Sequence, residues 1–396
     1  MAFERVNMMR IGDVCSTISD TYRAKADEVT LINTSDVLEG KVLNHARVPN
    51  KELKGQFKKT FKKNDILYSE IRPQNKRFAF VDFDPVDYIA STKLMVLRAD
   101  TTKVLPMYLY FYLKSEPVIS ELQMLAETRS GTFPQITFTE LSNLTIPVPS
   151  IAKQKEISDT IQCIEDKMSC NAKINDNLQQ QAQTLFAEYF CLRDGDSIPD
   201  GWSLISLGDV AVISNKSFNP LKQPETMLEH YSIPAFDEMH YPVFELSSAI
   251  KSNKFIVDAD CFMISKLNPT TKRVWRPYCM TDNAVCSTEF IVYKAKERML
   301  TDFLYSLIDS VPFSDFMCSH VTGSTGSRQR TIPSDTLQYQ FYLPTAGEIA
   351  VFSAMVAPMY AQIRINAMEN ARLKALRDSL LPRLMSGEIE VSDIEI

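Results

Sequence analysis

Two long stretches of the chain carry apolar residues at the spacing of an α-helix that packs along one side. In the first stretch, the apolar residues lie at Ile157, Ile161, Ile164, Met168, Leu178 and Leu185. No proline or glycine occurs between Pro149 and Gly195, so nothing in this stretch breaks a helix. A second stretch near the C-terminus has Phe352, Met359, Ile363, Leu373, Leu380 and Leu384. Seams close to a heptad repeat predict two long helices that bury their apolar sides against each other.

A polar residue interrupts each seam at an equivalent place, Asn171 in the first and Asn366 in the second. Each asparagine is either an ordinary surface residue or half of a buried polar pair that fixes the register of the two helices. Pro358 has no counterpart in the first stretch. We therefore expect it to start the second helix or to kink it.

The segments before the two helices mix short apolar runs with a few helical patterns. Runs at 78–81, 94–97, 255–257 and 290–293 predict buried strands, and 106–113 and 300–308 predict amphipathic helices. Each segment then passes a turn-rich stretch, at 130–132 or 322–327, and a proline-bounded strand, at 146–149 or 341–344. Both segments therefore predict globular α/β (α+β) domains.

Four blocks of sequence recur in one register, 196 residues apart. They are Ile11-Gly12-Asp13-Val14 with Leu207-Gly208-Asp209-Val210, the run at 67–73 with 263–269, Lys76-Arg77 with Lys272-Arg273, and the run at 89–96 with 285–292. A repeat of this length is a duplicated domain. We predict head one at 1–150, a long helix at 151–192, head two at 193–345 with a linker at 193–201, and a second helix with its tail at 346–396. A two-fold relation between the copies requires antiparallel helices, and so predicts a dumbbell with a coiled-coil bar.

Composition narrows the class of protein. The chain begins without the basic-then-apolar layout of a signal peptide, and its longest apolar stretch, 349–361, is too short and too interrupted to span a bilayer. The eight cysteines form no C-x-x-C pair, so neither a zinc framework nor a disulfide framework is expected. We expect a cytoplasmic protein with reduced thiols and no membrane partner.

The net charge is −6, yet basic residues gather at matching places in the two repeats. Between residues 51 and 77, nine Lys or Arg face three acids; between 251 and 276, six face two. A single lysine run is most often a solvated surface, but recurrence in register favours an anionic partner such as DNA.

Motifs for catalysis are absent from the sequence. It contains no dinucleotide-binding or Walker glycine motif, no amino-methyltransferase signature, no nucleophile elbow and no metal-binding histidine pair. Asp82, Asp84, Asp87 and Lys93 could resemble a nuclease cluster, but the second repeat has no match. We therefore expect a binding protein with no metal or cofactor of its own.

Three segments carry a family resemblance. The stretch 146–178, the entry Ile198-Pro199-Asp200-Gly201-Trp202, and the C-terminal run 380–389 resemble the specificity subunit of type I restriction–modification systems. The resemblance extends over essentially the full length. It implies two target-recognition domains that each read half of a bipartite double-stranded DNA site, and paired helices that set the spacer and dock two modification (methyltransferase) subunits. Restriction subunits would join them. S-adenosylmethionine, ATP and Mg²⁺ would belong to these partners.

Candidate DNA contacts follow from the residue types. Lysines neutralise phosphates, and Arg, Asn, Gln and Thr side chains read base edges. In head one the candidates are Lys58, Lys59, Lys62, Lys63, Arg72, Gln74, Asn75, Lys76 and Arg77. In head two they are Asn268, Thr270, Thr271, Lys272, Arg273, Arg276, Arg328 and Arg330. Positions that match between the heads are expected to hold the DNA backbone, and positions that differ are expected to distinguish two unlike half-sites.

Two other interpretations remain open at this point. One is a coiled-coil scaffold with two protein-binding heads and no reading of DNA. The other is a self-sufficient nuclease or methyltransferase, which the missing motifs disfavour.

Overall fold

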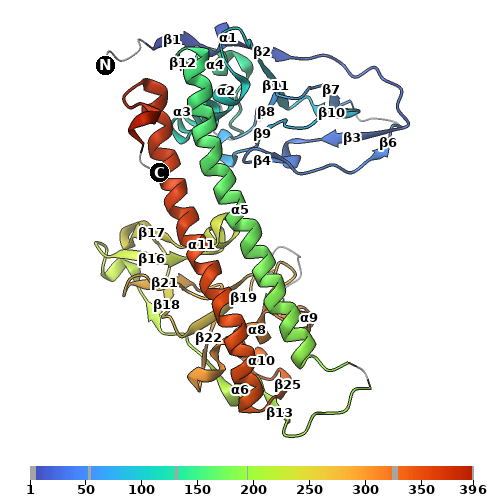
Figure 1. Ribbon diagram of the computed structural model, residues 1–396, viewed down its shortest axis with the longest axis vertical. Helices are drawn as coiled ribbons and strands as arrows, with labels where there is room; N and C mark the ends of the chain where they lie inside the picture. Colours follow the sequence, from blue (N-terminus) through green and yellow to red (C-terminus); the bar gives the residue numbers. More distant parts are fainter. Residues whose placement is uncertain (1–5, 52–54, 130–132, 194, 323–328, 395–396) are drawn as a thin grey trace. The chain divides into compact units, whose positions relative to one another are not determined.

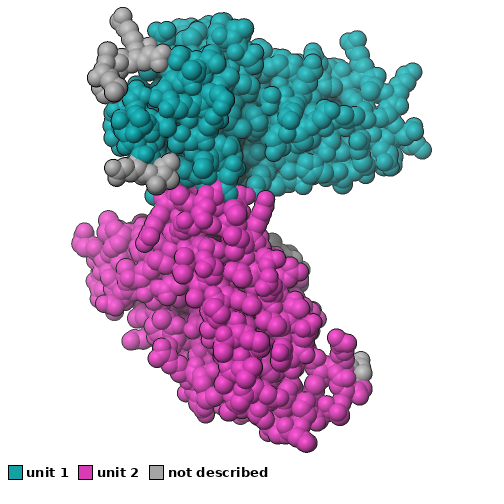
Figure 2. All heavy atoms as spheres, in the orientation of Figure 1, with its two compact units in different colours: residues 1–166, 374–396 teal, residues 167–373 magenta. Residues whose placement is uncertain are grey.

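The computed structural model describes residues 6–51, 55–129, 133–193, 195–322 and 329–394, which form two compact units (Figures 1 and 2). Unit 1 consists of residues 1–166 and 374–396, and unit 2 of residues 167–373. The long helices α5 (Ile151–Phe190) and α11 (Ala346–Ser386) each contribute a part to both units. Each unit therefore contains one head and a portion of both helices.

Head one is built on two four-stranded sheets. The first has the order β2 (Cys15–Ile18), β11 (Leu94–Ala99), β8 (Ile66–Ser69), β9 (Phe78–Phe80). The second has the order β6 (Val48–Pro49), β3 (Glu28–Ile32), β10 (Tyr88–Ser91), β7 (Phe57–Lys59), with β3 and β10 parallel. The buried core between them includes Ile32, Leu67, Leu94 and Val96.

Short elements complete head one. Helices α1 (Ile11–Val14), α2 (Pro106–Leu113), α3 (Glu116–Arg129) and α4 (Phe138–Asn143) accompany the 3₁₀ turns η1 (Thr34–Asp36) and η2 (Pro73–Asn75). Strand β1 (Asn7–Arg10) pairs with β12 (Thr145–Val148), and β4 (Val37–Leu38) with β5 (Lys41–Val42). The pairing of β1 with β12 brings the start of the head beside the strand that leads into α5.

Head two repeats this topology. Its first sheet has the order β14 (Ala211–Ile213), β22 (Phe290–Ala295), β19 (Cys261–Ser265), β20 (Val274–Trp275). Its second has the order β15 (Ser217–Phe218), β18 (Lys254–Ile256), β21 (Ala284–Ser287), β16 (Met227–Tyr231), β17 (Val243–Leu246). Strands β16 and β21 are parallel, like β3 and β10. The tandem duplication read from the four recurring blocks is thus present in the strand order.

The remaining elements of head two follow the same plan in part. They are β13 (Ser203–Ser206), which pairs with β25 (Gln340–Leu343), β23 (Val321–Thr322), which pairs with β24 (Arg330–Thr331), and the helices α6 (Leu207–Val210), α7 (Ile233–Met239), α8 (Thr301–Ile308), α9 (Val311–Ser319) and α10 (Pro333–Thr336). The 3₁₀ turns are η3 (Pro220–Lys222), η4 (Ser247–Ala249) and η5 (Arg298–Leu300), and η7 (Val391–Asp393) follows α11 in unit 1.

The strands and helices expected from the apolar patterns lie within two residues of their observed positions. Helix α2 begins at Pro106, where proline fits because the first turn of a helix needs no backbone donor, and α8 begins at Thr301. The expectation that Pro358 starts the second helix was wrong, whereas a kink at this residue stays a prediction. Helix α11 begins at Ala346 and continues through Pro358 to Ser386 as one helical segment, so this proline neither starts nor divides it.

The two long helices run antiparallel in both units. In unit 1, Lys153 pairs with Glu390 and Glu165 with Arg377. In unit 2, Asn171 bonds Asn370 and Asn175 bonds Asn366, so partner numbers fall as α5 numbers rise.

The twelve apolar residues of the two seams are all buried or half-buried. Ile157, Ile161, Ile164, Phe352, Leu380 and Leu384 are buried, while Met168, Leu178, Leu185, Met359, Ile363 and Leu373 are half-buried. Near the end of α5, the rings of Phe186 and Phe190 contact those of Phe303 and Phe352.

Among the described residues, one helix, α11, is long enough and apolar enough to cross a membrane, judged by length and composition alone. The core helices of water-soluble proteins pass the same test. Three residues near its start, Ile349, Phe352 and Val356, belong to the buried core of unit 2.

Candidate nucleic-acid interface

Four segments of head one are joined in a row by backbone hydrogen bonds. The Ile136 N–H donates to the Glu70 carbonyl at 2.8 Å, and the Glu70 N–H donates to the Lys93 carbonyl at 3.0 Å. The Thr92 N–H in turn donates to the Gln56 carbonyl at 2.7 Å. The loop after β8, the β10–β11 turn, the start of β7 and the segment before α4 therefore form one rigid platform, which we call row one (residues 55–59, 69–76, 91–94 and 133–137).

Head two contains the same arrangement. The Thr331 N–H donates to the Lys266 carbonyl at 3.1 Å, and the Lys266 N–H donates to the Glu289 carbonyl at 2.9 Å. Lys254 on β18 is registered with Ser287 on β21. We call this platform row two (residues 252–254, 265–272, 287–290 and 329–331).

A left-handed residue stands at the same place in each row. Arg72 has φ 44° and Asn268 has φ 47°, and their N–H groups donate to the carbonyls of Pro134 and Gln329 at 3.1 and 2.9 Å. Left-handed backbone is strained for residues other than glycine and is tolerated where surrounding bonds hold it. Both loops are thus held in one shape, while the side chain at this position differs between the heads.

Six of the nine predicted contact residues of head one are exposed to solvent. Arg72, Gln74 and Asn75 lie in row one near the 3₁₀ turn η2, Lys58 lies in row one on β7, and Lys62 and Lys63 follow β7. Within the described part of the chain, these three lysines have no ion pair, so their charge is available to solvent anions.

The other three are engaged inside head one. The Lys59 ammonium donates to the carbonyls of Thr92 and Leu94 at 3.1 and 2.8 Å, and its burial lowers the pKa of this amine. Lys76 forms an ion pair with Glu116, and Arg77 donates to the carbonyls of Ser35 and Val37. These three cations therefore bind groups within head one and stabilise its structure.

In head two, most predicted cations also bind protein groups. Lys272 forms an ion pair with Asp309 at 2.8 Å, and Arg276 with Asp302. Arg273 makes a two-point ion pair with Asp237 at 2.6 and 2.8 Å. Thr270 and Thr271 are exposed, Asn268 is half-buried, and Arg328 lies outside the described residues.

Lys272 and Arg276 line a cavity of about 880 Å³ in unit 2, together with aromatic side chains that include Trp275 and Tyr278. The cavity lies between head two and the parts of α5 and α11 in that unit. The acidic partners of both cations, Asp309 and Asp302, line the same cavity.

Two charged positions that the sequence reasoning did not select lie in the middle of both rows. In head one they carry Glu70 and Lys93, which pair at 3.7 Å, whereas in head two they carry Lys266 and Glu289. Glu289 instead binds Arg330 through two hydrogen bonds, at 3.0 and 3.1 Å. The signal was present in the repeat alignment, where matched positions have opposite charge.

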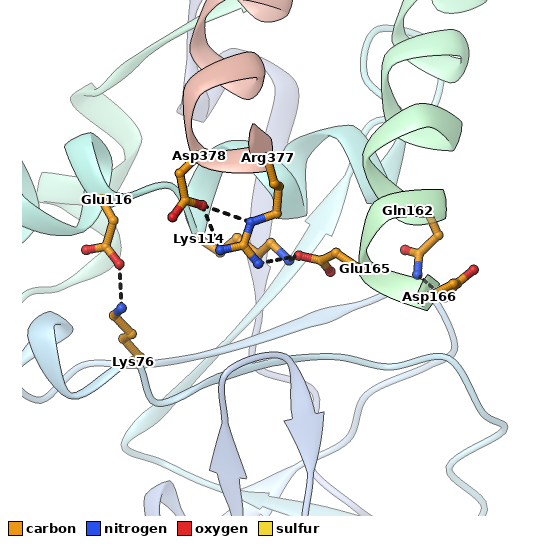
Figure 3. A network of polar contacts seen from close by, with 8 residues as sticks. All are labelled: Lys76, Lys114, Glu116, Gln162, Glu165, Asp166, Arg377 and Asp378. Atoms are coloured by element: carbon orange, nitrogen blue, oxygen red, sulfur yellow. Dashed lines mark hydrogen bonds and ion pairs between the residues drawn. The ribbon is translucent and has the colours of Figure 1, made fainter. Parts of the chain in front are cut away.

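A polar network fastens head one to both long helices (Figure 3). Lys114 follows α2, lies over the rings of Tyr110 and Phe111 at 4.8 Å from each centroid, and forms an ion pair with Glu165 of α5. Arg377 of α11 reaches the same carboxylate at 3.0 Å. Burial lowers the pKa of the Lys114 amine. Because the helix dipole stabilises a cation at the C-terminus of a helix, the dipole of α2 also stabilises the charge of Lys114.

Gln154, the first buried polar residue of α5, adds a second link in unit 1. Its side chain accepts from the Leu105 N–H at 2.8 Å and donates to the carbonyls of Lys103 and Pro149 at 2.9 Å. Ile349 stands at the equivalent place in α11 and is buried among apolar side chains.

The junction of head two uses the opposite charge. Asp309 follows α8 as Lys114 follows α2, and it accepts hydrogen bonds from Gln183, at 2.6 Å, and Gln179 of α5. Lys272 completes the cluster. Since an anion at a helix C-terminus is unfavourable for the dipole, the lysine offsets the charge.

Asparagines of α5 and α11 form a cluster with two-fold symmetry in unit 2. Asn171 Nδ2 donates to Asn370 Oδ1 at 2.9 Å, and Asn366 Nδ2 donates to Asn175 Oδ1 at 2.8 Å. Asn370 and Asn175 then donate to the carbonyls of Met168 and Ile363, which are also equivalent. Asn171 and Asn366 are both buried, and each bonds the asparagine four residues beyond the other.

Comparison with known proteins agrees with this architecture. Residues 4–180 match the family model described as "Type I restriction modification DNA specificity domain". The chain is 30% identical to the type I restriction enzyme HindI specificity subunit of Haemophilus influenzae, covering 96% of this chain and 98% of that protein. It is 24% identical to the MjaIX specificity subunit of Methanocaldococcus jannaschii over 72% of this chain and 70% of the relative. The crystal structure of a type I S subunit from M. genitalium aligns over 96% of both chains, with a TM-score of 0.56 and 15% identity.

Proposed function

Since the chain belongs to the family of type I restriction–modification specificity subunits, it recognises a DNA sequence, and we propose that each head reads one half of a bipartite site. Rows one and two support this proposal. They share a backbone hydrogen-bond pattern but display different side chains, with Arg72 in one and Asn268 in the other. One scaffold with two sets of side chains suits two unlike half-sites.

Phosphate contact and base contact fall to different residues in this proposal. The exposed lysines Lys58, Lys62 and Lys63 neutralise phosphates and supply affinity that is independent of sequence. Gln74, Asn75 and the threonines Thr270 and Thr271 are exposed near the left-handed residues and carry groups able to bond base edges.

We further propose that α5 and α11 act as the spacer between the half-sites and as the dock for two modification subunits, which restriction subunits would join. A helix of 40 residues, like α5, is about 60 Å long. Methyl transfer with S-adenosylmethionine, and the chemistry that uses ATP and Mg²⁺, would belong to these partners, and this chain would be non-catalytic. We place the complex in the cytoplasm, where the cell's DNA is accessible.

The test is to express the chain with its modification subunit in a host free of methylation and to map modified bases across the genome. A split motif, two short defined halves around an undefined spacer, is the expected result. Exchanging residues 1–150 for the head of a relative should then change one half of the motif only. A stable complex that leaves the genome unmodified would contradict the proposal.

A further inference from the structure

Arg330 has a backbone position that is fixed on both sides. It pairs with Thr322 in the β23–β24 ladder and forms a bridge with Leu267 in the loop after β19. The next residue, Thr331, is buried and its hydroxyl donates to the Met317 carbonyl at 3.0 Å. Since successive residues of an extended segment point to opposite faces, the Arg330 side chain points away from the core of the head.

Glu289 orients the guanidinium of Arg330. Arg330 Nε and Nη2 contact the two carboxylate oxygens at 3.0 and 3.1 Å, a geometry that defines the plane of the guanidinium as well as its position. Glu289 is itself held, because its N–H donates to Ser287 Oγ at 3.2 Å and its carbonyl accepts from Lys266. The side chain of Arg330 remains 43% exposed and that of Glu289 29% exposed.

The carboxylate also changes what Arg330 attracts. A lone surface cation binds any phosphate, which is the part of DNA binding that carries no sequence information. An arginine beside a carboxylate is nearly neutral as a pair, so its attraction to phosphates is weakened. A guanidinium can present two N–H groups in one plane to the O6 and N7 acceptors of guanine, which is the commonest specific contact in the major groove.

We propose that Arg330 reads a guanine in the half-site of head two and that Glu289 is its positioning residue. This inference rests on the proposed function, since it names a base contact within one recognition domain. Row two then contains one base-reading arginine, whereas the exposed lysines of head one serve phosphates.

Head one provides the matched comparison. Gln135 holds the place of Arg330, because it forms the equivalent bridge with Ile71 and precedes the buried Ile136. Lys93 holds the place of Glu289. Head one therefore lacks an arginine–carboxylate pair at this position of its row, and its half-site should differ there.

The experiment maps methylated motifs for the chain and three variants, each expressed in full with the modification subunit. Arg330→Gln should lower the preference for guanine at one position of one half-site by about 10- to 100-fold. Arg330→Lys should do the same, because lysine lacks the planar two-point geometry. Gln135→Ala, the matched change in head one, should leave the half-site of head two unchanged.

Glu289→Gln separates positioning from folding. It should weaken the preference for guanine at the same position, and it should also strengthen binding of the purified complex to unrelated DNA, with a steeper dependence on salt, because Arg330 regains its full charge. Damage to the fold would instead weaken binding to both specific and unrelated DNA.

The results distinguish the inference from the proposed function. If wild-type protein methylates a split motif and Arg330→Gln leaves both halves unchanged, or loosens every position of its half equally, the role of Arg330 is refuted. If wild-type protein yields no split motif, the proposed function itself fails.

Discussion

The adjacent residues Lys58 and Lys59 perform different tasks. Both lie on β7, so their side chains leave opposite faces of the sheet. Lys59 binds two carbonyls of the β10–β11 turn, whereas Lys58 is exposed. The sequence showed the run of lysines and its recurrence, but it could not show which of them had backbone carbonyls within reach, because those carbonyls come from residues more than thirty positions away.

The exposed lysines of head one lead to a prediction about salt. Replacing Lys58, Lys62 and Lys63 with glutamine should weaken DNA binding without changing the recognised motif, and the slope of log affinity against log salt should fall by about 0.9 for each lost phosphate contact. Fluorescence anisotropy at several salt concentrations measures this slope. Lys59→Gln serves as the comparison, since it should lower thermal stability instead, and an unchanged slope in the triple variant would remove these lysines from the interface.

His230 in head two predicts a dependence of stability on pH. Burial lowers its pKa below the ordinary value of about 6.5, while its bond to Glu245 acts in the opposite direction. The unfolded chain therefore takes up the proton first, and the free energy of unfolding should decrease as pH falls from about 6.5 through the folded pKa.

Denaturant titrations of wild type and His230→Gln between pH 5 and 7.5 measure this effect. The variant should show a flatter profile, with the difference in slope at most about 1.4 kcal/mol per pH unit. Parallel profiles for the two proteins would rule out His230 as the source.

At the scale of elements, the helix seam was readable from sequence because its apolar period extends over several heptads. The apolar pattern predicted the two helices and the burial of residues such as Ile161 and Leu384, and the two-fold relation of the repeats predicted their antiparallel pairing. It missed Asn175 and Asn370, which complete the asparagine cluster, because a polar residue one turn from another polar residue reads as surface. The pairing partner of each asparagine depends on the register of the second helix, which a single sequence leaves open.

The asparagine cluster should contribute measurably to the stability of the helix pair. Asn171→Leu removes the donor to Glu369 and to the half-buried Asn370, whose side-chain oxygen loses this partner, so it should lower the free energy of unfolding by roughly 1–3 kcal/mol. Chemical denaturation followed by circular dichroism measures the loss. Asn177→Leu, at an exposed position of the same helix, should have little effect. A stabilised Asn171→Leu protein would mean that the polar bonds are weaker than apolar packing at this site.

At the scale of the whole molecule, repetition was the most accessible property. Recurring blocks predicted two heads with one topology, and the strand order confirms it. The junctions were not predictable, because Lys114 and Asp309 stand at equivalent places with opposite charge and meet different partners on α5. Similarity between the repeats predicts their shared fold. The role of a residue that differs between them depends on the side chains that the fold places next to it.

The role of the helices as a spacer can be tested by lengthening them. Seven residues inserted after Asp166 in α5 and after Leu373 in α11, where the two units meet in sequence, preserve a heptad seam and add about 10 Å to each helix. The undefined spacer of the methylated motif should grow by about three base pairs, since the rise of DNA is about 3.4 Å per base pair. An insertion into α5 alone breaks the register and should abolish methylation. An unchanged spacer in the doubly lengthened protein would exclude the helices as the ruler.

The asparagine cluster joins two helices that present the same groups to each other. Asn171 and Asn175 of α5 meet Asn370 and Asn366 of α11, so each helix offers what the other requires. The hydrogen bonds of this cluster, which we call the asparagine joint, therefore do not depend on which head precedes which helix. A head exchanged together with its own junction to the helices, through Lys114 or Asp309, would therefore leave the asparagine joint intact, so the side chains of the rows can change while the pairing of the helices stays the same.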